Sequence, residues 1–586
     1  MTRLNDLVFT DRGLSDECVA PAPKQPVCVA MVLTLVYLCA REVVSDHGLS
    51  AAWLSCVPGE LYRPLLDAAF ARCRPLAVGE LVQRWPERTL SVGGRRKRDH
   101  EPPNRLCVQA LLLAVVRGLT DKRCCLQVLD LCGLQREDGR SEDAMGGWSL
   151  TVALCSTLLQ ARNVTTASRG RKRDEREKKK RGLETETERD GAVKRDRAGL
   201  KKEEGERMDC GDNAAPARGT STPEEENITG VRRRMELQRR NGAQPQQVPS
   251  RDDVLVDVRA DLFVNARSWE RVRGALNISG PLRLRCRFLR VEELPASSIA
   301  SLLHLLPQDE LLGVDVRYSS LGISGLALLL PRLAPFPRLS SLRLHYCNLD
   351  VLRARPGQQE ALQDVSRGLG ELKTLRRLSL TALRMPGRLR LLLSSLSEPL
   401  EALELPYLSL TSGDVAYLSR SPHASSIAEL DLSENRLDES SLHSLCYLLA
   451  RAERCLMRLS LCGCGLSDGP LRALLPTLGQ CHALRSLRLA LNPLSRAALV
   501  ELARAAAGID SLRLLLYPNP LEEYEPGLPP LPSSTQLLDW PLIEESEVKE
   551  VTLMQLDEVL RAKGRTQDLL MTSDLLKYST DLAVDD

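Results

Sequence analysis

Cysteine and histidine are the residues of this 586-residue chain best suited to metal binding or nucleophilic chemistry, and the chain contains 18 and 7 of them. The cysteines form no Cys-x-x-Cys pair and have no zinc-finger spacing, so the sequence predicts neither a metal site nor thioredoxin-like chemistry. Free thiols in a reducing compartment are expected instead. The sequence contains no phosphate-binding Gly-x-Gly-x-x-Gly loop, and GGWS at 146–149 is not a nucleophile elbow. We therefore predict a binding protein without catalysis or a cofactor.

One short pattern near the N-terminus has the spacing of a partner-binding helix. In TLVYLCAREV, residues 34–43, Leu35, Cys39 and Val43 recur at every fourth position and so share one helical face. The pattern resembles the BC-box, through which substrate receptors bind elongin C. In this interpretation Leu35 fills a pocket, Cys39 allows close approach and Val43 adds an apolar contact, as in helix-in-groove recognition. A plain core helix is the alternative.

Two other segments bear on this interpretation. SLHSLCYLLA at 441–450 fits the same pattern, but its leucine and cysteine are needed for repeat packing, so one of the two matches is expected to be spurious. Downstream of the first match, Pro64, Leu65 and Leu66 lie in a stretch that resembles the cullin-2 box of such receptors. The presence of this stretch favours residues 34–43 as the genuine elongin C-binding pattern.

The uncharged apolar run at residues 27–40 offers another interpretation. The run is shorter than the roughly 20 residues that span a bilayer, but its length suits a secretory signal. A secreted recognition protein with glycans at Asn163, Asn227 and Asn277 is thus one alternative. Because no clear small-x-small cleavage site follows the run, a docking helix is the better interpretation.

Leucine-rich repeats fill the C-terminal half of the chain. The unit L-x-x-L-x-L-x-x-N/C-x-L occurs in full or with substitutions at residues 312–321, 339–349, 375–383, 400–410, 427–437, 456–466 and 484–494. Intervals near 28 residues leave room for a helix after each strand, and the longest interval contains an insertion at 350–362. The Asn or Cys position can satisfy backbone groups in the turn. The prediction is an α/β solenoid, a ribonuclease-inhibitor-like horseshoe with its parallel sheet on the concave side.

The outward strand positions of such a sheet form its binding surface. Large polar and aromatic side chains dominate protein interfaces. We therefore expect a protein client to contact Arg317, Tyr318, Arg343, His345, Tyr346, Glu404 and Tyr407. Simple solvation of each side chain is the alternative.

Composition divides the chain into segments. We expect an extension without fixed structure at 1–30, an α-rich N-terminal domain at 31–162, a charged linker at 163–250, repeats at 251–516 and a C-terminal cap at 517–586. Apolar spacing predicts helices at 61–70, 104–119 and 441–452 and a strand-like segment at 126–134. The linker lacks apolar periodicity and cannot bury enough surface to fold. Its basic run at 169–182 is either solvated linker or a nuclear-import signal. The net charge of +3 excludes a dedicated nucleic-acid binder.

Several longer segments carry a family resemblance. Residues 34–43 together with ELYRPLLDAAF at 60–70, LQVLDLCGL at 126–134, LRLRCRFLRVEELP at 282–295 and YPNPLEEYE at 517–525 resemble the PRAME-type leucine-rich repeat family. The resemblance implies a substrate receptor of a cullin-2 RING ubiquitin ligase, with elongin B and elongin C on the N-terminal helices. It also implies a damping role in NF-κB signalling through an inhibitor-of-kappa-B kinase.

The predicted function is that of a non-catalytic receptor in the cytoplasm, with a nuclear location as a second expectation. Holding a client beside the ligase would favour ubiquitin transfer through proximity. The main rival is a repeat scaffold that sequesters a signalling protein without any ligase. No nucleic-acid or membrane partner is predicted. Residues 1–30 and the long linker depart from the family pattern.

Overall fold

The computed structural model describes residues 35–45, 56–92, 104–119, 125–134, 149–163, 256–278, 280–350, 358–543 and 546–575. The expected extension at 1–30 and the expected linker beyond Asn163 lie outside these residues. Most of the expected insertion at 350–362 also lies outside them.

One parallel sheet connects the described parts of the chain. Its strands pair in chain order, from the first to the last. They are β1 (Thr89–Ser91), β2 (Val128–Asp130), β3 (Val256–Asn265), β4 (Leu282–Glu292), β5 (Gly313–Arg317), β6 (Ser341–His345), β7 (Arg377–Thr381), β8 (Ala402–Glu404), β9 (Glu429–Asp431), β10 (Arg458–Ser460), β11 (Ser486–Arg488), β12 (Leu514–Leu516) and β13 (Leu570–Thr572). The seven predicted repeats supply the strands β5 to β11.

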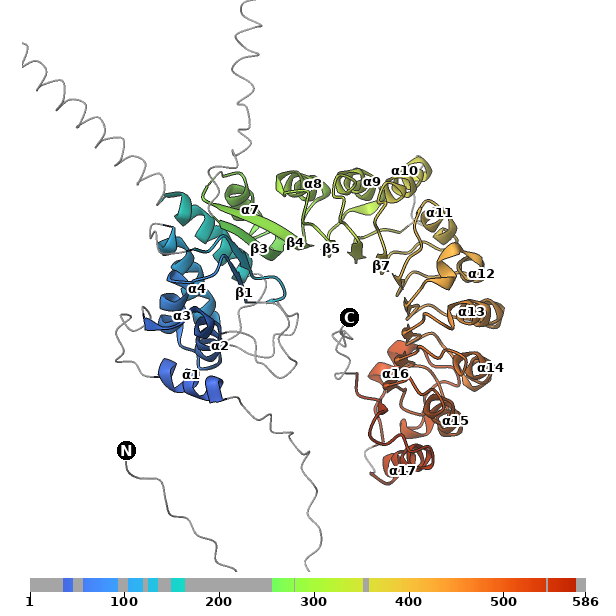
Figure 1. The fold of residues 1–586 in the computed structure, drawn as a ribbon. Coiled ribbons are helices and arrows are strands. Elements are labelled where there is room, and N and C mark those ends of the chain that lie inside the picture. The colour runs from blue at the N-terminus through green and yellow to red at the C-terminus, as the bar shows by residue number, and fades with distance from the viewer. Residues whose placement is uncertain are drawn as a thin grey trace, which may run out of the picture.

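Helices cover the outer side of this sheet. The described helices are α1 (Leu35–Ser45), α2 (Tyr62–Ala71), α3 (Pro75–Gln83), α4 (Arg105–Gly118), a helix at 149–163, α7 (Trp269–Leu276), α8 (Ala296–Leu305), α9 (Gly322–Leu333), α10 (Gln358–Gly370), α11 (Leu389–Leu393), α12 (Ser412–Arg420), α13 (Glu439–Ala452), α14 (Asp468–Leu478), α15 (Arg496–Ala507), α16 (Ser534–Asp539) and α17 (Ser546–Ala562). Unlike the repeat helices, α16 lies on the inner side of the arc seen in Figure 1, and α1 packs against α2. Short 3-10 turns are η2 (Gly59–Leu61), η5 (Pro422–Ser425) and η6 (Leu521–Glu523).

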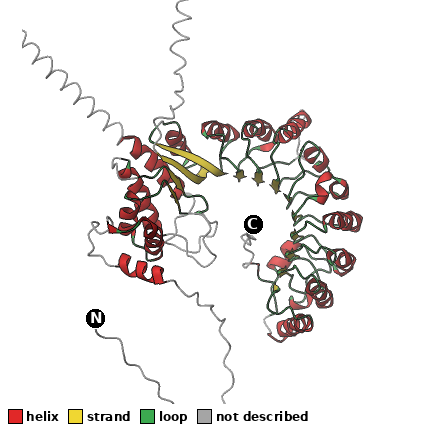
Figure 2. Ribbon diagram, viewed as in Figure 1, coloured by secondary structure: helices red, strands yellow, loops and turns green. Residues whose placement is uncertain are grey.

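The repeats curve because their two layers differ in width. Neighbouring strands lie about 4.8 Å apart, whereas packed helices need about 8–10 Å. Figure 1 accordingly shows an arc with the strands on its inner side and α8 to α15 on its outer side. Alternate strand residues such as Leu342 and Leu344 of β6 are buried in the core, as are helix residues such as Leu329 and Leu330 of α9. The predicted α/β leucine-rich repeat solenoid is confirmed, and Figure 2 shows its helical and strand layers.

The Asn or Cys position of the repeat stabilises the turn after each strand, as the sequence predicts. The Asn435 side chain accepts hydrogen bonds from the backbone N–H groups of Leu408 and Leu410, both at 3.1 Å, and donates to the Leu405 carbonyl at 2.8 Å. Cys347 occupies the same repeat position, and its thiol donates to the Val316 carbonyl at 3.6 Å. These side chains replace backbone partners that the turn lacks.

The N-terminal helices are continuous with the repeats through the sheet. β1 pairs with β2, and β2 pairs with β3, so two short strands from the expected α-rich region extend the solenoid. The Trp85 indole N–H donates to the Thr89 carbonyl at 3.0 Å and fixes the turn into β1. The strand-like segment predicted at 126–134 is β2.

The C-terminal region closes the other end of the sheet. β13 pairs with β12, and α17 packs against α15. Arg565 is buried after α17 and donates to the carbonyls of Ile509 and Leu512 at 2.9 and 2.7 Å. The guanidinium thus satisfies backbone acceptors at the end of the last helical layer.

Candidate functional site

Three tyrosines line one edge of the concave surface. Tyr318 and Tyr346 directly follow β5 and β6, and Tyr407 follows β8. Their side chains remain 55, 47 and 49% exposed. The rings of Tyr318 and Tyr346 stack at a centroid distance of 5.3 Å and an angle of 14°. We call these three residues the tyrosine row.

The tyrosine row occupies the same backbone position in three of four successive repeats. The φ angles of its residues are 51°, 53° and 58°, in the left-handed region that costs a non-glycine residue on the order of 1 kcal/mol or more. Backbone hydrogen bonds from Tyr318 to His345 and from Tyr346 to Thr381, both 3.0 Å, keep the row in register. Ala382 takes this position between Tyr346 and Tyr407, with φ 56°. The small alanine leaves a gap in the row between the two aromatic side chains.

The remaining predicted client contacts lie on the strands beside the row. Arg317 pairs with Asp315 of its own strand, at 2.8 Å between Nη2 and Oδ2. The Nε2 atom of His345 lies 3.3 Å from the Ser379 hydroxyl, and burial lowers the pKa of this histidine. Arg343 and Glu404 make no ion pair with any residue in the described part of the chain. The structure thus brings all seven predicted residues to one face, but Arg317 and His345 are partly engaged by internal contacts.

One residue of this surface was not among the client contacts predicted from the sequence. Glu434 holds the left-handed position of the repeat after Tyr407, with φ 58°. Its carboxylate accepts a hydrogen bond from the Ser534 hydroxyl at 2.6 Å and another from Tyr407. Burial raises the pKa of Glu434, and burial together with this carboxylate raises the pKa of Tyr407. Alignment of the repeats at the position after the strand would have found it.

Two of the three residues of α1 predicted to bind elongin C are exposed to solvent. Leu35 is 76% exposed, and Cys39 is also exposed. Ala40 and Val44, on another side of the helix, are buried in the core, and Val43 packs partly against it. Figure 1 shows α1 beside α2, at the end of the N-terminal helices away from the repeats. Exposed large apolar side chains that cluster in this way are typical of an interaction surface.

The second match to the same pattern lies in α13 and is differently placed. Leu442 and Cys446 are half-buried and pack against the repeat core. The Cys446 thiol also donates to the Ala473 carbonyl of the next helix, at 3.8 Å. This leucine and cysteine therefore serve the packing of neighbouring repeats.

The stretch predicted to bind a cullin lies mainly inside the protein. Leu65 and Leu66 of α2 are 5 and 1% exposed, and Pro64 is half-buried. The two leucines hold α2 in the core, so direct cullin contact by their side chains does not fit this structure. Of the three predicted residues, Pro64 alone presents appreciable surface.

The described cysteines and histidines do not form a reactive centre. No three of the His, Cys, Asp and Glu side chains in the described ranges converge as metal ligands, and the described cysteines are free. Burial raises the pKa of Cys155 and Cys347 to about 12, so both thiols stay protonated near neutral pH. In the same ranges, no helix is long and apolar enough to cross a membrane. Of the sequons of the secretion alternative, Asn163 and Asn277 are exposed and Asn227 lies outside the described residues.

Comparison with known proteins assigns the chain to a protein family. Models of the PRAME N-terminal domain and the PRAME C-terminal domain match residues 33–138 and 270–528. The chain is 35% identical to leucine-rich repeat-containing protein 14 of Xenopus laevis over 84% of this chain and 88% of that protein. The chain belongs to the PRAME family. The human protein of the same name is 31% identical over 92% of this chain and 97% of its own length.

One solved structure with some likeness to this PRAME-family chain is that of a leucine-rich repeat-containing protein. LegL7 from Legionella pneumophila is 15% identical, with a TM-score of 0.31 over 56% of this chain and 96% of its own. Repeat proteins of this architecture are interaction scaffolds, in which the curved sheet offers an extended binding surface. The sheet and helices of the PRAME-family chain itself make it a leucine-rich repeat solenoid with three tyrosines along its concave edge.

Proposed function

We propose that the chain is a non-catalytic substrate receptor of a cullin-2 RING ubiquitin ligase, in which α1 binds elongin C of the elongin B–C pair. The observation that carries the proposal is the contrast between the two matching helices. In α1 the leucine and cysteine of the pattern are exposed, whereas in α13 they pack between repeats. Exposed apolar side chains on a helix suit insertion into a groove of another protein.

The tyrosine row and the strand residues beside it are the proposed client surface. Exposed tyrosines on rigid backbone lose little conformational freedom on binding and are enriched at interface hot spots. The left-handed position holds Tyr318 and Tyr346 rigidly above the sheet. An inhibitor-of-kappa-B kinase is the client that we propose from the family resemblance. Ubiquitin transfer would then depend on proximity and on the chemistry of other subunits.

Co-purification from human-type cells tests the ligase proposal. The wild type and the variant Leu35→Ala plus Cys39→Lys are captured, and elongin B, elongin C and cullin-2 are quantified by mass spectrometry. We expect all three with the wild type and a loss of about tenfold or more with the variant, since a lysine in a packed groove leaves a desolvated charge. A matched control, Leu76→Ala plus Cys73→Lys, changes another exposed leucine and cysteine of the N-terminal helices and should retain them.

Sequestration without a ligase is the second candidate, favoured by the stacked pair Tyr318 and Tyr346. The two candidates differ in an NF-κB reporter assay. If the receptor proposal holds, the α1 variant and the variant Tyr318→Ser plus Tyr346→Ser both lose the damping of the reporter. If the chain sequesters its client, only the tyrosine variant loses it. An unchanged melting temperature of the tyrosine variant serves as the control for intact folding.

A further inference from the structure

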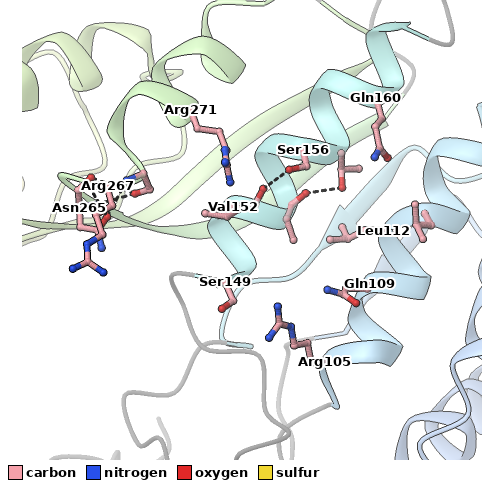
Figure 3. Close-up of a pocket in the computed structure, with 14 residues that line it drawn as sticks. Arg105, Gln109, Leu112, Ser149, Val152, Ser156, Gln160, Asn265, Arg267 and Arg271 are labelled. Carbon is pink, nitrogen blue, oxygen red and sulfur yellow. Dashed lines mark hydrogen bonds between the residues drawn. The ribbon is translucent and has the colours of Figure 1, made fainter.

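A groove lies among the helices of the N-terminal region and is lined by none of the tyrosine-row residues. Its volume is about 610 Å³, and it is open to solvent. Figure 3 shows that it follows the helix at 149–163, with α4 on one side and α7 on the other. Ser149, Val152, Ser156 and Gln160 form the stripe of that helix along the groove. Because most of these side chains are short, the groove stays open along the helix.

Three arginines from separate elements line this groove. Arg105 begins α4, Arg267 lies in the turn after β3, and Arg271 lies on α7. In Figure 3 the side chains of Arg105 and Arg271 extend toward the helix at 149–163 from opposite sides. All three are exposed, and none forms an ion pair with another residue that the structure describes. No aspartate or glutamate is among the described residues that line the groove.

Arginines on the neighbouring strand β4, unlike those of the groove, are paired with carboxylates. Arg283 of β4 pairs with Asp257 of β3 at 2.7 Å, and Arg285 pairs with Asp309 at 2.5 Å. The groove arginines lack such carboxylates. Their positive charges therefore combine to give the groove a positive electrostatic potential. A concave surface lined by one sign of charge attracts ligands of the opposite sign.

The other groove residues fit the same class of ligand. Gln109, Gln160 and Ser149 can donate hydrogen bonds into the groove, as the guanidinium groups can. Carboxylates only accept hydrogen bonds, and arginine binds them with paired donors. Leu112 and Leu113 add an apolar wall, and Leu113 is 46% exposed. An extended peptide that alternates acidic and aliphatic side chains satisfies both kinds of surface.

We propose that this groove binds an acidic segment of a partner protein, with glutamate or aspartate side chains held by Arg105, Arg267 and Arg271. The aliphatic side chains of that segment contact Leu113 and Val152. This inference does not depend on the ligase role, because it concerns neither α1 nor the concave strands.

Fluorescence anisotropy on the full chain tests the proposal. The probes are a fluorescein-labelled peptide of sequence ELEAELEA and its uncharged counterpart QLQAQLQA. We expect the acidic peptide to bind about tenfold more tightly at low salt, as charge-assisted hydrogen bonds are stronger than neutral ones. The triple variant Arg105→Ala, Arg267→Ala and Arg271→Ala should reduce that affinity about tenfold. Equal binding of the two peptides by the wild type would overturn the proposal.

A matched charge control separates this groove from general attraction. Arg332→Ala, Arg338→Ala and Arg504→Ala remove the same charge from exposed arginines on the repeats. This control should bind the acidic peptide like the wild type, and an equal loss with both triple variants would contradict a local site. A photo-leucine version of the peptide locates it directly. We expect cross-links to residues 105–113, 149–160 or 265–271, whereas cross-links confined to the basic run at 169–182 would overturn the assignment.

Discussion

At the scale of single residues, His423 links two repeats through both of its ring nitrogens. Nδ1 accepts a hydrogen bond from the Leu400 N–H, and Nε2 donates to the Leu393 carbonyl, each at 3.2 Å. The side chain is 1% exposed. Because a protonated Nδ1 could not accept from an N–H group, this site requires the neutral imidazole. Burial accordingly lowers the pKa of His423.

This arrangement predicts a loss of stability on mild acidification. The pKa of His423 is lower in the folded chain, so as the pH falls through about 6.5 the unfolded chain gains a proton that the folded chain does not. We expect the melting temperature to fall between pH 7.5 and pH 5, and to fall less in the variant His423→Gln. His443→Gln, at an exposed position of α13, is the control and should keep the wild-type slope. Equal slopes for the wild type and the His423 variant would contradict the account.

Asn435 yields a second prediction at this scale. Replacement by alanine leaves the buried N–H groups of Leu408 and Leu410 without their acceptor. We expect Asn435→Ala to lower the free energy of unfolding by about 3 kcal/mol. Asn435→Cys should cost less, since Cys464 at the same repeat position donates to the Leu432 carbonyl at 3.3 Å. Denaturant unfolding measures both variants, and an equal cost for the two would contradict a hydrogen-bonding role.

The roles of some residues could be predicted from the sequence and those of others could not, for physical reasons. The Asn and Cys positions were predictable because the repeat pattern fixes a turn with a constant hydrogen-bonding need. The tyrosines were expected on outward strand positions, but they lie just after the strands at positive φ. A backbone conformation rare for non-glycine residues leaves no compositional signal. The burial of Leu65 and Leu66 was also missed, because a pattern match does not tell which helical face packs inward.

At the scale of helices, α1 and α13 carry the same pattern in opposite environments. We expect Leu442→Ala plus Cys446→Lys to destabilise the chain by about 2 kcal/mol or more, because it removes packing and places a charge between repeats. Leu35→Ala plus Cys39→Lys should leave the melting temperature unchanged, since both side chains are exposed. Differential scanning calorimetry compares the two variants. A lower melting temperature for the α1 variant would instead favour a packing role for this face.

Helices and strands of the repeats were predictable because the leucine spacing changes from that of a strand to that of a helix in each unit. The helices predicted at 61–70, 104–119 and 441–452 correspond to α2, α4 and α13. The arginine-lined groove was not predictable. Its residues are far apart in the sequence, and the fold alone brings Arg105 and Arg271 to the same helix.

At the scale of the whole molecule, the N-terminal region and the repeats contribute strands to one sheet. Removal of residues 1–250 deletes β1 and β2 and leaves β3 as an edge strand of ten residues. Long unpaired edges promote association with other chains. We therefore expect residues 251–586 to aggregate or to form oligomers, and light scattering measures this against the full chain. A stable monomer with the full-length melting temperature would contradict structural continuity.

This continuity could not be predicted from the sequence. β1 has three residues, too few for an alternating pattern to stand out. The strand-like pattern at 126–134 predicted β2, but it gave no sign that β2 pairs with β3 beyond the charged linker. The curvature, by contrast, follows from the repeat itself, since the unit combines a narrow strand with a wide helix.

Hydrogen–deuterium exchange of the purified chain with and without the elongin B–C complex tests the central claim most directly. The account predicts slower exchange of the α1 amides when the complex is present, and unchanged exchange in α13. In the variant Leu35→Ala plus Cys39→Lys, the protection of α1 should disappear. Unchanged exchange of α1 in the wild type, or protection that persists in the variant, would contradict the proposed receptor function.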